Sequence, residues 1–595
     1  MAVMETPAEC VLRIDNREIK FNISGIQLDQ FVDDHHQLTI RIQEVGRKEA
    51  DRDFSQPENY TGFLGSSVSL NLRATAGVLA EGAELEFVGV VTDVQLENSI
   101  DGLNVVLIHA ASPTIAMDGV ARNAHYHDVT AGDIVSSLVS RYPMTVGRIE
   151  STEGVMEFNS QYRETDYDYI MRLAGASGKF AYYDGREFYF ASAAGSDSVI
   201  LNWRENLGVF RLGLGTAPME FRSAIYNYEQ KKVYSQDSQS ISQQASLSDI
   251  SGISPEASRR IFADSSFSMP GERVSDAQAL DRKLKNERGR AMGAMVRCTG
   301  QSIVPAVGIG KTLEINGMEA LDGQYWVKGV RHIFDDSGKY HNIFICTPLD
   351  IAYPDRVQVQ RDLAVEEKPI TAVTSSRTVR EIKEKKVSGM QVAEVVNLED
   401  PEKLGRIRVR YPWLDSDQTH WVRISVPHAG QGRGWFSLPE IGDEVLVGFE
   451  NGDSNYPVVL GSLYNKENAP MDEAYSGEND IKMFMTRSGN KIVFNDADGG
   501  EQIVISQKDD TNRIVLDISG PSISISTEGD ISVTGSNLNV EAEKGITMKA
   551  GSDIKIEGAN VEIKAKANIK SEAGANQDIK GSAQVNVKGG MINLN

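Results

Sequence analysis

The chain has 595 residues, a mass of 65.3 kDa, a formal net charge of −23 and a pI near 5.0. This length is too great for a single hydrophobic core and predicts several domains. The acidic balance argues against non-specific binding to nucleic acid or to anionic lipid, and no basic patch with interleaved aromatic residues offsets it.

The first part of the chain is predicted to be rich in strands. Apolar and polar side chains alternate from about residue 11 to residue 110, which is typical of half-buried strands. The spacing becomes helical over 130–141, where Thr130 is expected to cap the helix and Asp133 to favour its first turn. A β-rich domain with a few helices is therefore expected.

A second helix and a hairpin are predicted next. The helix covers 166–177, and strands at 180–183 and 187–190 are joined by the turn sequence Asp184-Gly185-Arg186. This part of the chain should therefore mix helix and strand.

Four different kinds of segment follow. Residues 235–269 are rich in Ser and Gln without firm periodicity, which predicts a long loop or irregular insertion. A charged helix is expected over about 275–292, and strands over 295–348. Residues 355–388 are polar and charged, so they are predicted to form a linker.

A small barrel is predicted after the linker, over 389–465. Short strands at this spacing in so small a unit favour a closed barrel, most simply the five-stranded OB type. The acidic balance and the lack of stacking aromatic residues on neighbouring strands favour a structural role over ligand binding. The expected strands are 391–397, 406–411, 421–426, 444–449 and 457–462.

A short repeat fills the C-terminal part of the chain. Two β-forming residues flank one residue, and this doublet recurs about every eight residues from Ile523 onward, loosening near Ile579. Both members of a doublet point to the same face of a short strand. The doublets predicted to form a needle core are Ile523 with Ile525, Ile531 with Val533, Ile546 with Met548, Ile554 with Ile556, and Val561 with Ile563.

So few apolar side chains cannot stabilise a lone strand, so the repeats must bury their faces together. Three intertwined chains would do this, and so would one chain coiled as a solenoid. A string of exposed edge strands would instead be an aggregation hazard. The intertwined trimer is the favoured interpretation.

Cysteine usage and the N-terminal sequence indicate the cellular compartment in which the chain is made. Cys10, Cys298 and Cys346 are odd in number and widely spaced, which fits neither a disulfide framework nor a zinc site, so buried thiols are expected. No basic segment followed by an apolar run opens the chain, and no 18 consecutive residues are apolar. The chain is expected to be made in the cytoplasm without a membrane anchor, and to need a route other than general secretion if it leaves the cell.

Two histidine pairs could suggest a metal site. His35 and His36 follow two aspartates, and His125 and His127 would share one face of a strand. No further Cys or His cluster supports either pair, so solvated loops are expected and no metal ligand is predicted.

An acidic run, Glu164, Asp166 and Asp168, could resemble a general acid–base pair. It opens a predicted helix, where helix capping and inter-domain salt bridges explain it better. No serine-nucleophile, zinc-protease or phosphate-loop motif is present, and Gly308 to Lys311 reads as a turn. Neither enzymatic activity, a catalytic residue nor a cofactor is therefore predicted.

Two motifs carry a resemblance to a known family. Residues 161–174 (QYRETDYDYIMRLA) resemble the signature helix region of the VgrG spike proteins of type VI secretion and of related contractile-phage tail hubs. Residues 400–413 (DPEKLGRIRVRYPW), with 421–423, 439–449 and 457–465, resemble the OB domain of the same family. The order of β-rich hub, small barrel and repeat needle is also the family's order.

The resemblance implies a mainly β fold and a homotrimer. The implied domains are a hub-like base of two barrel-like subdomains (1–354), a linker (355–388), an OB-fold domain (389–465), a neck (466–500) and an intertwined triple-stranded β-helix, or β-prism, needle (501–595). In the family the base sits on a hexameric tail tube, and the needle carries a PAAR-type tip protein. The residues expected to dock that tip are Val585, Val587, Met591, Ile592, Leu594 and Asn595.

The implied function is that of a structural puncturing spike of a contractile injection system. The partners would be the tube, baseplate proteins, the tip, and effectors or adaptors, but no nucleic acid. The protein would stay cytoplasmic until sheath contraction and would meet the target membrane only on firing. The alternatives are the hub and spike of a phage tail or extracellular particle, and a carbohydrate-active β-solenoid enzyme or adhesin, although Glu557 and Glu562 do not align as the paired carboxylates of a glycosidase.

Overall fold

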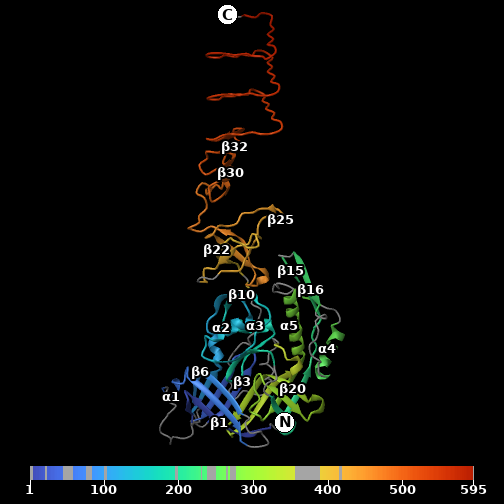
Figure 1. The fold of residues 1–595 in the computed structure, drawn as a ribbon. Helices are drawn as coiled ribbons and strands as arrows, with labels where there is room; N and C mark the ends of the chain where they lie inside the picture. Colours follow the sequence, from blue (N-terminus) through green and yellow to red (C-terminus); the bar gives the residue numbers. More distant parts are fainter. Residues whose placement is uncertain are drawn as a thin grey trace. The chain divides into compact units, whose positions relative to one another are not determined.

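The computed structural model divides into two compact units, residues 1–469 and 470–595, and each is described by itself. Strands dominate the first unit (Figure 1). None of the described helices is long and apolar enough to cross a membrane. The residues described are 4–19, 23–43, 58–75, 84–98, 104–193, 198–228, 231–237, 249–262, 266–268, 277–354, 387, 389–414 and 418–593.

Eight antiparallel strands of the first unit pair in a closed ring, the first ring. Their order around the ring is β20, β3, β4, β7, β6, β5, β1 and β21, and β21 pairs again with β20. The inward positions are apolar, as Leu38, Ile40 and Ile42 illustrate, which confirms the strands expected from the alternation. The bounds are β1 Thr6–Ile14, β3 Ile23–Phe31, β4 Gln37–Gln43, β5 Ser67–Ala74, β6 Glu84–Asn98, β7 Asn104–Ala111, β20 Gly323–Asp335 and β21 Lys339–Pro348, with β2 Arg17–Glu18 on β1.

A second, smaller ring shares β20 and β21 with the first. Its further strands are β13 (Ser198–Asn202), β19 (Thr312–Asn316), β18 (Val296–Ser302) and β14 (Leu207–Leu214). Among the described residues no ladder joins β13 to β14, and a single bridge, Trp203 with Leu207, spans the turn between them. Each ring has its own apolar core, which is consistent with the two barrel-like subdomains of the prediction.

A mixed lobe lies between the two rings in the sequence. Both predicted helices are confirmed there, because each begins at a capping threonine. Thr130 and Asp133 form a reciprocal capping box, and Thr165 accepts a hydrogen bond from the Asp168 amide. The lobe contains β8 Arg122–Val129, α2 Ala131–Val139, β9 Thr145–Ile149, β10 Met156–Glu164, α3 Asp166–Ser177, β11 Phe180–Tyr183 and β12 Glu187–Ala191, and is preceded by α1 Glu58–Thr61 and the short helix Pro113–Asp118.

The C-terminal end of α3 is fixed by residues distant in sequence. Gly178 ends the helix in the left-handed region with φ +65°, and a Cβ there would overlap the Tyr353 hydroxyl. Arg290 donates to the carbonyl of Gly175, and Asn286 Nδ2 donates to the Ala176 carbonyl at 2.5 Å. These contacts satisfy carbonyls that the helix leaves without partners.

We therefore expect Gly178→Ala to lower the free energy of unfolding of the first unit by about 2–3 kcal/mol, since it adds left-handed strain to overpacking. Gly338→Ala is the matched control, because Gly338 has φ +76° but nothing within 4 Å of a Cβ. Gly338→Ala should lower the free energy of unfolding by only about 1–2 kcal/mol. Denaturant unfolding of the full chain measures both values, and equal losses would contradict the overlap at Tyr353.

The loop predicted over 235–269 is partly wrong, because it contains helix α4 (Asp249–Ile261). The buried residues of α4 are Ser251, Ser254, Pro255 and Ser258, so hydrophobic periodicity does not reveal the helix. Ser251 Oγ donates to Asp350 Oδ1 at 2.8 Å, which satisfies one buried hydroxyl. The neighbouring elements are β15 Phe221–Asn227, β16 Lys232–Asp237, β17 Ser266–Ser268 and α5 Ala277–Met295, the predicted charged helix.

The small barrel follows the predicted linker, most of which (355–386 and 388) lies outside the described residues. Its five strands form one sheet in the order β23, β22, β27, β28 and β24, and a bridge between Ile407 and Val422 closes it. The bounds are β22 Gln391–Asn397, β23 Arg408–Arg410, β24 Arg423–Ile424, β27 Glu444–Phe449 and β28 Pro457–Leu463, with the hairpin β25 Ala429–Gly430 and β26 Arg433–Gly434. The predicted five-stranded barrel is confirmed.

The second unit begins with an antiparallel meander of five strands. Each strand pairs with the next, so the sheet spans both the predicted neck and the start of the predicted needle. The strands are β29 Ile481–Met485, β30 Lys491–Asn495, β31 Gln502–Ser506, β32 Arg513–Asp517 and β33 Ser522–Ser526.

Beyond the meander, residues 527–593 of this single chain contain no helix or strand (Figure 1). The predicted core residues are exposed here, for example Ile554 at 56% and Ile556 at 67%. The intertwined needle therefore stays a prediction about several chains.

Candidate functional site

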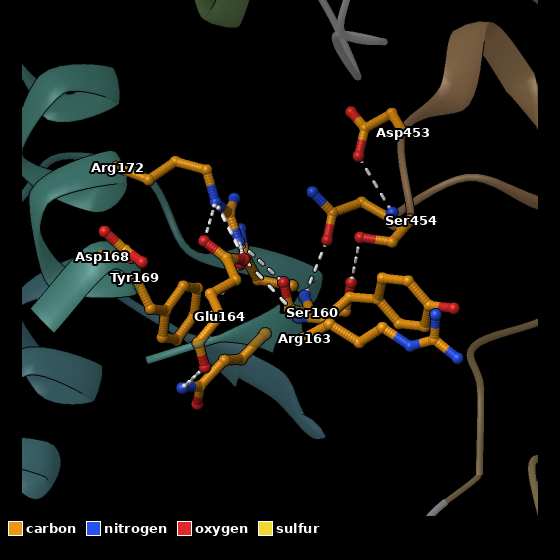
Figure 2. A network of polar contacts seen from close by, with 12 residues as sticks. Ser160, Arg163, Glu164, Asp168, Tyr169, Arg172, Asp453 and Ser454 are labelled. Carbon is orange, nitrogen blue, oxygen red and sulfur yellow. Dashed lines mark hydrogen bonds and ion pairs between the residues drawn. The ribbon is translucent and has the colours of Figure 1, made fainter. Parts of the chain in front are cut away.

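The lobe and the small barrel contact each other through a polar network, which we call the seam (Figure 2). The Ser160 amide on β10 donates to Asn455 Oδ1 at 2.6 Å, and Ser160 Oγ donates to Ser454 Oγ at 2.7 Å. Ser454 and Asn455 lie in the barrel loop between β27 and β28. The seam thus joins segments almost 300 residues apart in sequence.

A half-buried ion pair supports the seam from the lobe side. Arg172 on α3 donates from Nη2 to Glu164 Oε1 at 2.7 Å, from Nε to Glu164 Oε2 at 3.1 Å, and from Nη2 to the Ser160 carbonyl at 2.7 Å. Burial opposes the guanidinium charge, but the Glu164 carboxylate outweighs it, and Tyr169 and Asp453 act in the same direction, so the pKa of Arg172 is raised. Arg172 therefore links helix α3 to strand β10, the strand that contacts the small barrel.

The three residues of the acidic run occupy different structural positions. Asp166 is buried and accepts hydrogen bonds from Tyr142 OH at 2.6 Å and from Gln161 Nε2 at 2.8 Å. Asp168 lies in the first turn of the capped helix, as the capping interpretation expects. Glu164 pairs with Arg172 of the same lobe, so the expectation of an inter-domain salt bridge is wrong for this residue.

An aromatic cluster lies beside the polar network. The Phe158 ring centroid on β10 is 4.7 Å from that of His420 in the barrel, 4.8 Å from that of His125 and 5.3 Å from that of His127. Tyr411 of the barrel lies 5.8 Å from His125. The seam therefore combines ring packing with hydrogen bonds.

Both histidine pairs lie in places other than the expected solvated loops. His125 and His127 are half-buried on β8, where β10 supplies the facing strand. His35 and His36 are buried, because Thr114 and Ser112 of a distant segment hydrogen-bond to the His35 ring at 2.8 Å and to the His36 amide at 3.0 Å. In the part of the chain that the structure describes, no group of three or more His, Cys, Asp or Glu residues could hold a metal ion.

Burial also sets the protonation of the core histidines. Desolvation lowers the pKa of His36 to about 3 and that of His332 to about 3, so both are neutral near pH 7. Gln30 links them, because its Nε2 lies 3.2 Å from His36 Nδ1 and its Oε1 lies 3.2 Å from His332 Nε2. The two imidazoles are thus fully buried and hydrogen-bonded through one glutamine.

The barrel has its own buried ion pair, Asp400 with Arg406, at 2.8 Å. Burial opposes ionisation of Asp400, but hydrogen bonds from the Arg406 side chain, the Arg406 amide and the amides of Leu404 and Glu402 outweigh it and lower its pKa to about 2. The same pairing raises the pKa of Arg406. This pair fixes the loop that leads into β23.

We expect the Asp400 pair to make the barrel sensitive to acid. The folded-state pKa lies below the ordinary value of 3.8, so the pair stabilises the fold above that value, and this contribution is lost as the pH falls from about 4 to about 2. Asp400→Asn should lower the unfolding temperature at pH 7 and flatten its dependence on pH in this window. Thermal unfolding of both proteins against pH measures this, and parallel profiles would contradict the assignment.

The expected tip-docking residues lie at the end of the second unit. Val585, Val587, Met591 and Ile592 are exposed in the single chain, and Leu594 and Asn595 lie outside the described residues. Their docking role stays a prediction.

The sequence interpretation missed Ser160, Ser454 and Asn455. The run Gly452-Asp453-Ser454-Asn455 signals a turn, but nothing in it indicates a partner on β10. Only the fold brings these residues together.

Known protein families match two regions of the chain. The phage tail baseplate hub (GPD) family matches residues 38–338, just over half of the chain, and the type VI secretion system/phage-baseplate injector OB domain matches residues 391–464. The seam therefore lies between two matched regions.

Characterised relatives match a smaller part. A type VI secretion system spike protein VgrG1a of Pseudomonas aeruginosa is 31% identical over 145 residues, which are 22% of this chain and 23% of that protein. An actin cross-linking toxin VgrG1 of Vibrio cholerae is 32% identical over 145 residues, 22% of this chain and 13% of that protein. The matches thus span less than a quarter of these relatives.

Solved structures support the fold. A VgrG–PdpA complex of Francisella in a lidded state aligns with a TM-score of 0.54 and 7% identity, covering 88% of this chain and 80% of that chain. At this identity the likeness concerns the fold alone.

Proposed function

Because the chain belongs to the phage tail baseplate hub family, we propose that it is the hub and spike of a contractile injection system of the type VI secretion kind. Its described rings would form the base, the small barrel a collar, and the C-terminal repeats the needle. The role is mechanical rather than enzymatic, although one relative carries the name of a toxin. The two matched families support both base and barrel.

The main observation that supports this proposal is the exposed apolar surface of the meander. One row of cross-strand neighbours on a single face is aliphatic or aromatic and exposed, running from Phe484 through Ile492, Ile505 and Ile514 to Ile525. Phe494, Ile503, Leu516 and Ile523 form a second row on the same face. A lone soluble chain rarely exposes such a continuous apolar surface.

Three copies would remove this surface from water. Each chain would supply one apolar face of a prism, and the doublets that follow would continue the same burial along the needle. Such a fibre would transmit axial force, because displacing one chain would break many interchain hydrogen bonds at once.

The remaining partners follow from this assembly. The base would bind a hexameric tail tube and baseplate proteins, and the blunt end with Val585 and Ile592 would bind a PAAR-type tip. Effectors or adaptors would be delivered together with the spike. The protein would be cytoplasmic before firing and would leave the cell through the apparatus.

The first test is the mass of the full chain in solution by light scattering. A mass close to three times 65.3 kDa is expected. A truncation after Gly500, which removes most of the apolar rows and all later doublets, should reduce the trimer fraction. A monomeric full chain would contradict the proposal and favour a single-chain solenoid.

The second candidate is the hub and spike of a phage tail or extracellular particle. The OB family that matches residues 391–464 covers both kinds of injector, which favours this candidate over any enzyme. Co-purification with a membrane-anchored baseplate would support type VI secretion, whereas co-purification with tail fibres would support the second candidate.

A further inference from the structure

Two of the three cysteines lie directly opposite each other in the second ring. Cys298 on β18 and Cys346 on β21 are cross-strand partners in the antiparallel ladder. Their side chains therefore point to the same face of the sheet. Both residues are buried, at 0% and 1% exposure.

The backbone spacing suits a covalent bond. Opposed residues in an antiparallel pair have Cα atoms about 4.5 or 5.5 Å apart, depending on the hydrogen-bonding pattern. A disulfide needs about 4.4–6.8 Å, so either pattern would allow one. The third cysteine, Cys10 on β1, faces Leu72 and has no such partner.

Strand β14 covers one side of the cysteine pair at the edge of the second ring. β14 flanks β18, and half-buried Leu212 is the cross-strand partner of Cys298. Arg211, Gly213 and Leu214 beside it are exposed, and no ladder within the described residues pairs β14 with β13. Local opening of β14 would expose the pair without unfolding the first ring.

We propose that Cys298 and Cys346 are a redox modification site, a cross-strand dithiol that a small disulfide oxidant converts to an internal disulfide. One thiolate attacks the oxidant and releases a thiolate. The second cysteine then attacks the resulting mixed disulfide and releases another. The two protein thiol protons end on the two released thiols, so the oxidant is reduced as the dithiol is oxidised.

Burial makes this reaction slow and its product persistent. Desolvation raises the pKa of the Cys346 thiol, so few thiolates form until β14 opens. Once formed, the bond would be equally hidden from reductants. It would join β18 to β21, a strand that belongs to both rings.

The inference does not depend on the proposed function. A spike that passes from a reducing to an oxidising compartment would acquire this bond only after transit.

The test uses the native full chain and bis(2-hydroxyethyl) disulfide as the oxidant. After denaturing alkylation and proteolysis, mass spectrometry should detect one linked peptide pair containing Cys298 and Cys346. Cys10→Ser should give the same linked pair, and Cys346→Ser should not. Alkylated thiols at both positions, or a stable mixed disulfide at either without the internal bond, would overturn the proposal.

A second readout covers the case in which Cys346→Ser folds poorly. Oxidised Cys10→Ser protein should unfold at a higher temperature than the same protein reduced. When the oxidised protein is denatured, reduced and refolded, its unfolding temperature should return to that of the reduced protein. An oxidised sample that contains the linked peptide but unfolds at the same temperature as the reduced protein would overturn the expected stabilisation.

Discussion

Replacing Ile554 and Ile556 together with Asp is expected to abolish the needle while the rings and the small barrel still fold. In the trimer these side chains would face the dry prism axis, so three chains would bring six carboxylates into it. Burying each unpaired charge costs several kcal/mol, which is more than the local doublets can offset. Light scattering and resistance to heat and detergent measure the loss.

Lys555→Asp is the matched control, because Lys555 lies between the two isoleucines and would point to the opposite face of the predicted strand. It changes the charge at the same place without reaching the axis, so the trimer should survive. A double variant as resistant as the unchanged protein would refute the buried doublets.

Arg172→Met is expected to have the second largest effect, because it leaves Glu164 buried without its cation. The Glu164 side chain is 8% exposed and that of Arg172 is 23% exposed. Breaking such a pair from one side costs about 3–5 kcal/mol. The Ser160 carbonyl also loses a donor, so hydrogen exchange should accelerate on β10 and in the barrel loop with Ser454.

Two comparisons isolate the cause. Glu164→Gln combined with Arg172→Met removes the stranded charge and should recover part of the loss. Arg410→Met breaks an exposed pair with Glu394, whose side chains are 41% and 45% exposed, and should cost only about 0–1 kcal/mol. Equal effects of Arg172→Met and Arg410→Met on unfolding would contradict the role of burial.

Local signals in the sequence were sufficient for several elements. Thr130 marks the start of α2 because capping depends on residues within one turn. The five strands of the small barrel were likewise visible from their alternation and turns.

The sequence was insufficient wherever a distant partner decides the outcome. Ser251 and Ser258 are buried on α4 because the core there accepts hydroxyl groups, which an apolar pattern cannot reveal. His35 is buried because Thr114 lies beside it, and Ser160 meets Asn455 from a part of the chain almost 300 residues away. The packing of the doublets is harder still to predict, since their partners would be on other chains.

The hairpin of β20 and β21 belongs to both rings, and this has a thermodynamic consequence. Neither ring can lose these two strands without opening the other, because each strand is hydrogen-bonded on both sides. The two cores are therefore linked as one cooperative unit, although each would be large enough to suggest a separate domain. Heat absorbed on unfolding the base should appear as a single transition, and a load applied to either ring would be shared by the other.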